Sequence, residues 1–213
     1  MIGALPVHTI LGISGPPRAG KDSIAKLICE LEHSAIIRRL SAPLKMIAGQ
    51  YLPLALRSGL ESRKDESLNS LGTTYRDLQI GTWILGRDLL GEDWLGAHFL
   101  DSIKYCPFNL ILVPDFGRLS EVMVLIHAGH RVLQIKVTRE GTTFEGDSRE
   151  DFTIPGPSNS ITFANSGDLA SLRRNVVDQI MPWLAGALEV APRKVSLLET
   201  EREGAPEKEP SNV

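Results

Sequence analysis

Apolar residues follow two alternating patterns along the chain. Short apolar runs occupy residues 8–14, 35–41, 109–115, 131–138 and 160–165, and each is typical of a strand buried in a sheet. Between them, apolar residues at helical spacing predict helices over 22–32, 42–52, 118–130 and 168–188. Strands that alternate with helices favour a parallel sheet covered by helices, so the expected fold class is α/β.

Three regions do not follow this alternation. Residues 53–104 lie between two expected strands and are mostly helical in pattern, so we expect a helical insertion beside the sheet. Residues 139–158 are polar and glycine-rich, which predicts a long mobile loop that acts as a lid. Residues 1–190 then form one domain, and the charged residues 191–213 are expected to be a disordered tail.

The composition is that of an ordinary soluble protein of 213 residues, with 42% hydrophobic and 23% charged residues. The net charge of −3 gives no broad basic surface for nucleic acid. We expect neither a signal peptide nor a membrane span, because no apolar run approaches the ~20 residues that a span needs. Cys29 and Cys106 form no metal-spaced pair and are typical of reduced thiols in a cytoplasmic protein. The sequence does not fix the oligomeric state, and a homodimer is allowed.

The stretch "GPPRAGK" at 15–21 fits G-x-x-x-x-G-K and lies between an expected strand and an expected helix. Gly15 and Gly20 let backbone N–H groups turn toward phosphate oxygens, and Pro16 and Ala19 complete the loop. The helix N-terminus adds its positive dipole end, and Lys21 is placed to reach the phosphates. The pattern therefore predicts a nucleotide phosphate site, and the alternative is a helix-capping turn without a ligand.

Asp22 stands where this motif usually has a serine or threonine that ligates Mg²⁺. A carboxylate is also a hard oxygen ligand, so we expect Asp22 to hold Mg²⁺ directly or through water, with Ser23 as a substitute hydroxyl. Asp115 ends the expected strand 109–115 at the sheet edge where ligands bind, which makes it a second candidate for Mg²⁺. The alternative for Asp115 is an N-cap of the helix that follows.

Several segments, in this order, carry a resemblance to a known family. "GPPRAGKDS" (15–23) and "RRLSAPLK" (38–45) are similar to the deoxynucleoside monophosphate kinases of tailed bacteriophages, and more distantly to animal phosphomevalonate kinase. The matches continue with "RDLQ" (76–79), "GRDLLGEDW" (86–94), "ILVPDFGRLSEV" (111–122) and "FANSGDLASL" (163–172). The resemblance covers roughly residues 9–185 and implies a P-loop NTPase-type sheet with a helical substrate-binding insertion.

The resemblance also implies a reaction. ATP and Mg²⁺ would phosphorylate a deoxynucleoside monophosphate to the diphosphate, in the host cytoplasm if the protein is phage-encoded. It assigns five residues to the acceptor: Lys45, Arg76, Gln79, Arg87 and Arg118. Gln79 could equally lie on a solvated helical face, and Arg87 could pair with a neighbouring carboxylate. The family's arginine follows the strand-end aspartate by two residues, whereas here Gly117 takes that position and Arg118 follows it.

The remaining candidates surround the donor. Arg18 is expected to flank the transferring phosphoryl group, or to be a solvated loop arginine. Arg139 and Arg149 lie on the expected lid, and a cation that arrives on closure would stabilise the transition state. The sequence does not indicate which of the two does so, and the alternative for Arg149 is an ion pair with one of the acidic residues around it. Asn165 and Gly167 are expected to border the donor adenine through backbone groups, and the alternative is a turn in which Asp168 caps the last helix. Two other functions stay open, namely a kinase for another small phosphorylated acceptor and a nucleotide-binding module without transfer activity.

Overall fold

The structure is a computed structural model that describes residues 6–68, 72–145, 149–156 and 159–189. The expected tail at 191–213 lies outside the described residues. Within the described part of the chain, no helix has both the length and the apolar content that a membrane crossing requires.

Five parallel strands form a single sheet in the order β2-β3-β1-β4-β5, which confirms the α/β class. The strands are β1 (Thr9–Ser14), β2 (Ala35–Ile37), β3 (Leu110–Val113), β4 (Arg131–Thr138) and β5 (Ser160–Ala164). β2 ends four residues before the expected boundary. After Ile37 the chain turns away, because the N–H groups of Leu40 and Ser41 bond to the Asp115 side chain instead of a strand.

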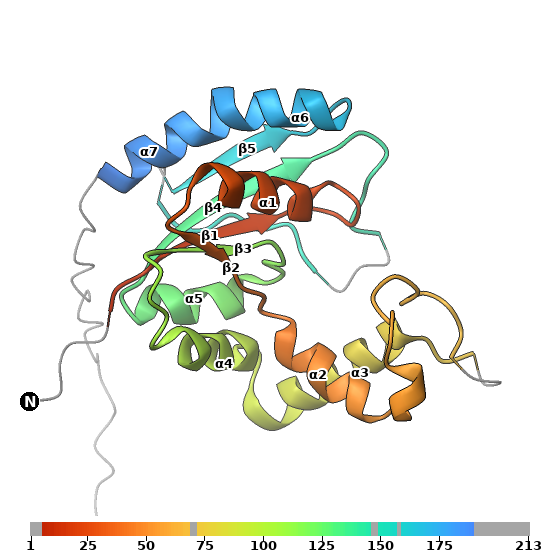
Figure 1. The fold of residues 1–213 in the computed structure, drawn as a ribbon. Coiled ribbons are helices and arrows are strands. Elements are labelled where there is room, and N and C mark those ends of the chain that lie inside the picture. Colours follow the sequence, from red (N-terminus) through yellow and green to blue (C-terminus); the bar gives the residue numbers. More distant parts are fainter. Residues whose placement is uncertain (1–5, 69–71, 146–148, 157–158, 190–213) are drawn as a thin grey trace, which may run out of the picture.

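Helices cover both faces of the sheet (Figure 1). Helix α1 (Lys21–Leu31), α6 (Leu169–Asn175) and α7 (Met181–Glu189) lie on one face, with the π-helical turn η2 (Val176–Ile180) joining the last two. Helices α4 (Trp94–Ile103) and α5 (Leu119–His127) lie on the other face. Strand side chains alternate between the two layers, so Leu11 and Ile13 pack on the α1 side and Ile10 packs on the α5 side.

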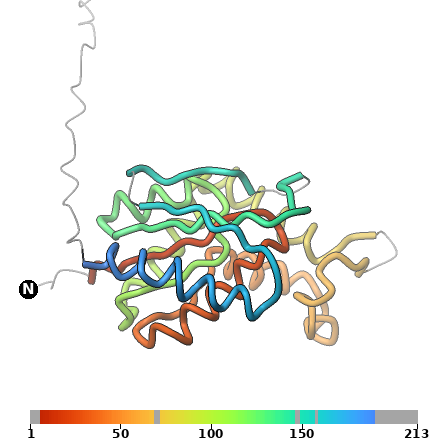
Figure 2. The backbone as a smooth tube through the Cα atoms, turned by 90° about the horizontal axis from the view of Figure 1, so that it is seen from above, coloured from red at the N-terminus to blue at the C-terminus, as the bar shows by residue number. Residues whose placement is uncertain are grey.

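The helices that project from the sheet cover a different range from the expected insertion at 53–104. Phe99 and Ile103 of α4 are buried in the core beneath the sheet, so α4 belongs to the helical cover. The projecting part consists of α2 (Ala42–Gln50), the 3-10 turn η1 (Leu54–Leu56) and α3 (Tyr75–Leu90), with residues 57–68 and 72–74 between η1 and α3 (Figure 2). α3 begins at a capping box, in which Thr74 and Asp77 satisfy each other's backbone N–H groups.

Part of the expected mobile loop is attached to the core. Phe152 and Ile154 are 8% and 3% exposed and belong to the same cluster as Phe99. The buried Gln134 side chain donates to the Phe152 carbonyl at 3.1 Å and accepts the Ile154 N–H at 3.1 Å. Two buried apolar side chains hold this part of the polar segment against the core, because the free energy gained by their burial offsets the conformational entropy lost when the short backbone around them is ordered.

Candidate active site

The glycine loop (residues 15–21) joins the end of β1 to α1 and forms a turn with its lysine folded across it. Gly15 and Gly20 have φ values of +140° and +98°, and Arg18 is also left-handed at +64°. The Lys21 ammonium donates to the carbonyls of Gly15 and Pro16, both at 2.7 Å, and the residue is only 7% exposed. Among the described residues no side chain caps the start of α1, and a helix N-terminus of this kind favours an anion.

Asn165 supports this loop from behind. Its side-chain amide donates to the Ala19 carbonyl at 2.8 Å, and the residue is 3% exposed. A Cβ at Gly20 would lie 2.3 Å from the Asn165 amide nitrogen, so this close approach requires glycine. The expected role of Asn165 rested on backbone groups, whereas the structure gives its side chain a positioning role. Gly167 lies in the exposed turn before α6, with a φ of +97°.

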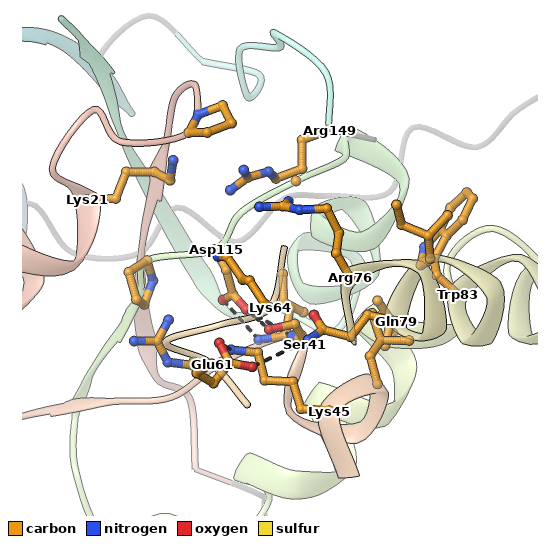
Figure 3. Close-up of a pocket in the computed structure, with 18 of the residues that line it drawn as sticks. Lys21, Ser41, Lys45, Glu61, Lys64, Arg76, Gln79, Trp83, Asp115 and Arg149 are labelled. Carbon is orange, nitrogen blue, oxygen red and sulfur yellow. Dashed lines mark hydrogen bonds and ion pairs between the residues drawn. The ribbon is translucent and has the colours of Figure 1, made fainter. Parts of the chain in front are cut away.

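One cavity of about 520 Å³ lies between the glycine loop, the end of β3 and the projecting helices (Figure 3). Nine of the expected site residues line it: Arg18, Lys21, Asp22, Lys45, Arg76, Gln79, Asp115, Arg118 and Arg149. The other nine do not line it: they are Gly15, Pro16, Ala19, Gly20, Asn165 and Gly167, in and around the glycine loop, together with Ser23, Arg87 and Arg139. Ser23 faces a groove between α1 and α6, Arg87 pairs with Asp88, and Arg139 lies in an exposed turn after β4. The substitute hydroxyl expected of Ser23 is therefore turned away from the cavity.

The two candidate metal carboxylates have different surroundings. Asp22 lies in the first turn of α1 with its side chain 59% exposed, and one oxygen pairs with Arg39. Burial alone would lower the pKa of Arg39, but the hydrogen bond to Asp22 and the nearby carboxylates outweigh burial and raise it. Asp115 accepts three hydrogen bonds from Leu40 and Ser41, including 2.6 Å from the Ser41 hydroxyl. Asp115 thus fixes the turn that leads into α2, not the start of α5.

The wall formed by α2 and α3 carries basic groups, each paired with an acid. Lys45 pairs with Glu61 at 2.8 Å, and the Gln79 amide lies 3.4 Å from the other Glu61 oxygen. Arg76 pairs with Asp65, and this hydrogen bond lowers the pKa of Asp65. Such exposed pairs contribute little stability, so an anionic ligand can replace the acid partner at low cost.

Of the two arginines on the expected lid, Arg149 reaches the cavity, and it passes close to Gly117. A Cβ at this position would lie 3.0 Å from Arg149 Cγ, so the missing side chain makes room for Arg149. Two further bonds dock the segment. The Glu150 N–H donates to the Gly117 carbonyl at 3.0 Å, and the Leu119 N–H donates to a Glu150 carboxylate oxygen at 3.0 Å. Arg118 meanwhile stacks on Trp83, with its guanidinium carbon 4.0 Å from a ring centroid.

Glu121 is a cavity residue to which the sequence analysis gave no role. It lies in the first turn of α5, lines the cavity and is 4% exposed. Burial raises the pKa of Glu121 to about 7, against the effects of a Trp83 hydrogen bond and Arg118, while Asp115 and Glu150 add to the rise. Glu121 is the glutamate of the segment "ILVPDFGRLSEV" (111–122), which carries part of the resemblance, but its burial depends on α3 and α4 and is not visible in that segment.

The cavity also contains Arg39, Glu61, Lys64, Asp65 and Trp83, none of which was among the expected site residues. Of these five residues, Trp83 lies on α3. Its position seven residues after Arg76 on α3 would have indicated the same helical face. Among the described residues, no group of three or more histidine, cysteine, aspartate or glutamate side chains is placed to hold a metal ion.

Comparisons with known proteins give remote structural neighbours only. No family model matches the sequence, and no curated protein matches it. An APS kinase from Mycobacterium tuberculosis in complex with AMPPNP and APS aligns at 16% identity and a TM-score of 0.41, over 81% of this chain and 97% of that chain. A mutant of that kinase aligns at 18% identity and 0.40, over 81% and 96%. A sugar kinase from Janibacter sp. aligns at 13% identity and 0.42, over 88% and 97%. This level of similarity carries no information on the reaction.

Proposed function

We propose that this protein is an ATP-dependent kinase that transfers a phosphoryl group to a deoxynucleoside monophosphate. The observation that carries the proposal is one cavity with phosphate-binding groups on two opposing walls. Lys21 and Arg149 lie on one side of it, and Lys45 lies on the other, beneath Gln79 (Figure 3). Transfer between two phosphorylated molecules needs two anion sites that face each other, because catalysis depends on positioning and charge neutralisation.

The donor triphosphate would bind at the glycine loop. Its backbone N–H groups and the uncapped start of α1 supply hydrogen bonds to the phosphate oxygens. When ATP binds, the Lys21 ammonium would leave the Gly15 and Pro16 carbonyls and donate hydrogen bonds to the β- and γ-phosphates instead. In the structure the two carbonyls hold the ammonium close to the expected position of these phosphates. Arg18 and Arg149 line the cavity beside it and would stabilise the charge that develops on the transferring group.

A magnesium ion fits the first turn of α1 better than the end of β3. Asp22 offers exposed carboxylate oxygens next to Lys21, and Mg²⁺ is commonly held by one or two carboxylates, waters and substrate phosphates. Asp115 already accepts three hydrogen bonds, so we assign it a supporting negative charge. The ion would supply charge neutralisation between the β- and γ-phosphates when bound. Arg39 would have to release Asp22 for this, which an exposed pair allows.

The acceptor monophosphate would bind between Lys45 and Arg76. Both are held by acid partners, so each is already oriented toward the cavity. Trp83 and the Gln79 amide line the same cavity and suit a base and its polar edge. A small isoprenoid phosphate has no base to pack on Trp83 or to hydrogen-bond with the Gln79 amide. The two side chains therefore favour a nucleotide over a phosphomevalonate-like acceptor.

An ADP-release assay with MgATP and each common deoxynucleoside monophosphate tests the proposal, with phosphomevalonate in the same panel. Activity on at least one deoxynucleotide is expected. Lys21→Arg should lower kcat by about 100-fold or more, because a guanidinium cannot take the lysine's place across the loop. Activity on phosphomevalonate alone would contradict the acceptor class. ATP binding with only slow hydrolysis, whatever the acceptor, would indicate the non-catalytic module instead.

A further inference from the structure

Glu121 is a buried residue that lines the cavity together with several apolar side chains. Leu44, Leu95 and Trp83 pack together there, and Ile80 of α3 lines the same region. The Trp83 indole, the Arg118 guanidinium and the Asp115 carboxylate lie near this carboxyl group. The cavity therefore has a cationic part near Arg76 and an apolar part that holds one carboxyl group.

The distance between these two parts suits a nucleotide. Arg76, Ile80 and Trp83 are spaced by four and three residues, so they share one face of α3. Seven residues of helix span roughly 10 Å at 1.5 Å per residue, which is comparable to the reach from the phosphate to the far edge of the base in a nucleoside monophosphate. A phosphate at Arg76 would place the base beside Glu121.

A carboxylate in this position selects for hydrogen-bond donors. It is acceptor-only when ionised, and its two oxygens can accept two parallel N–H bonds. Among the common bases, guanine presents two adjacent donors, N1–H and the N2 amino group, on its Watson–Crick edge. Adenine presents one donor beside an acceptor, and thymine presents one donor between two acceptors.

We propose that Glu121 is a specificity-determining residue that accepts the N1–H and N2–H groups of a guanine base, so that the preferred acceptor is a guanine deoxynucleotide. This assignment rests on the proposed function, because it takes Arg76 as the site of the acceptor phosphate. It also explains why a carboxyl group is buried here at a cost in free energy. A ligand with two N–H donors would offset the desolvation of the carboxylate with two hydrogen bonds.

Comparison of dGMP with dIMP, which lacks only the N2 amino group, tests the assignment. For the unmodified protein, kcat/KM should be about 10- to 100-fold higher for dGMP, the effect of one hydrogen bond to a charged acceptor. Glu121→Gln has one acceptor and one donor, so the dGMP-to-dIMP ratio should fall close to one, mainly through the KM for dGMP. Glu92→Gln, at an exposed position outside the cavity, is the matched control and should keep the ratio.

Calorimetric binding of dGMP and dIMP separates this inference from the proposed function. If dGMP binds more tightly than dIMP and Glu121→Gln removes the difference, base recognition stands even where no phosphoryl transfer occurs. If deoxynucleotides are phosphorylated without a preference for dGMP over dIMP, or if Glu121→Gln keeps the preference, the assignment is wrong while the kinase proposal survives. Absence of dGMP binding also overturns it.

Discussion

Glu121 should make the stability of this protein fall as the pH rises, and Glu121→Gln should remove that effect. The pKa of Glu121 rises from its ordinary value of 4.5 to about 7, chiefly because of burial. A carboxyl group whose pKa is raised on folding binds more protons in the folded state. Its favourable contribution is therefore complete below about pH 4.5 and is lost as the pH rises through about 7.

The magnitude follows from these two pKa values. They differ by about 2.5, and each pKa unit corresponds to about 1.36 kcal/mol, so ionisation of Glu121 costs about 3 kcal/mol of unfolding free energy above pH 7. The groups that face the carboxyl act in both directions. Trp83 and Arg118 favour the charged form, whereas Asp115 and Glu150 oppose it. Glutamine keeps the shape and hydrogen-bonding capacity of the protonated acid and carries no charge to bury.

Urea unfolding of both proteins at about pH 5 and about pH 8.5 measures the effect. Near pH 5 the two unfolding free energies should be close, and at the higher pH Glu121→Gln should be more stable by up to about 3 kcal/mol. The exposed change Glu92→Gln should produce no such pH-dependent difference. A stability difference between the unmodified protein and Glu121→Gln that is equal at both pH values would refute the reasoning. A stabilised variant that loses its acceptor preference would show that the carboxylate is retained at a cost to the fold.

Three other positions give independent expectations. Asn165→Ala removes a buried hydrogen bond to the glycine loop, so the unfolding free energy should fall by about 1–3 kcal/mol and the Kd for ATP should rise. Urea denaturation measures the first quantity and ATP titration measures the second. An unchanged Kd would contradict the positioning role of Asn165. Gly117→Ala places a Cβ 3.0 Å from Arg149 Cγ and should displace this arginine, so kcat should drop while ATP still binds. If steady-state kinetics give an unchanged kcat, Arg149 does not stabilise the transferring phosphoryl group. Burial, and then His8, lowers the pKa of His130, so the folded state binds fewer protons there than the unfolded chain. Relative to His130→Gln, the protein should therefore lose stability as the pH falls from about 7.5 to about 5, and urea titrations that find a pH-independent difference would exclude this.

The parts of the site that depend on residues adjacent in sequence were predictable. The glycine loop, its lysine and the following helix lie within one short stretch, and the strand before it is identified by its apolar run. Arg76 and Gln79 share a helical face whose spacing is fixed by the α-helix, and both line the cavity. The parallel sheet followed from the alternation of strands and helices, because each apolar run needs cover on both faces.

In contrast, the positions where the expected strand 35–41 ends and where the expected loop 139–158 is ordered depend on individual tertiary contacts. The strand 35–41 ends at Ile37, because Asp115, more than seventy residues later, accepts the N–H groups of the next turn. The polar segment 139–158 is partly fixed by Phe152 and Ile154, which reach the core next to Gln134. Neither outcome can be read from a local pattern, because each depends on a partner that folding brings near.

The sequence by itself determined the α/β class and the place of the glycine loop, because both depend on local periodicity and on backbone freedom at defined positions. Only the tertiary structure decided that Arg149 and not Arg139 reaches the cavity, that Ser23 faces another groove, and that Glu121 is a buried carboxyl at its apolar end. These outcomes depend on which surfaces pack together. A side chain's burial and pKa are properties of its neighbours in space, and most of those neighbours lie on other elements.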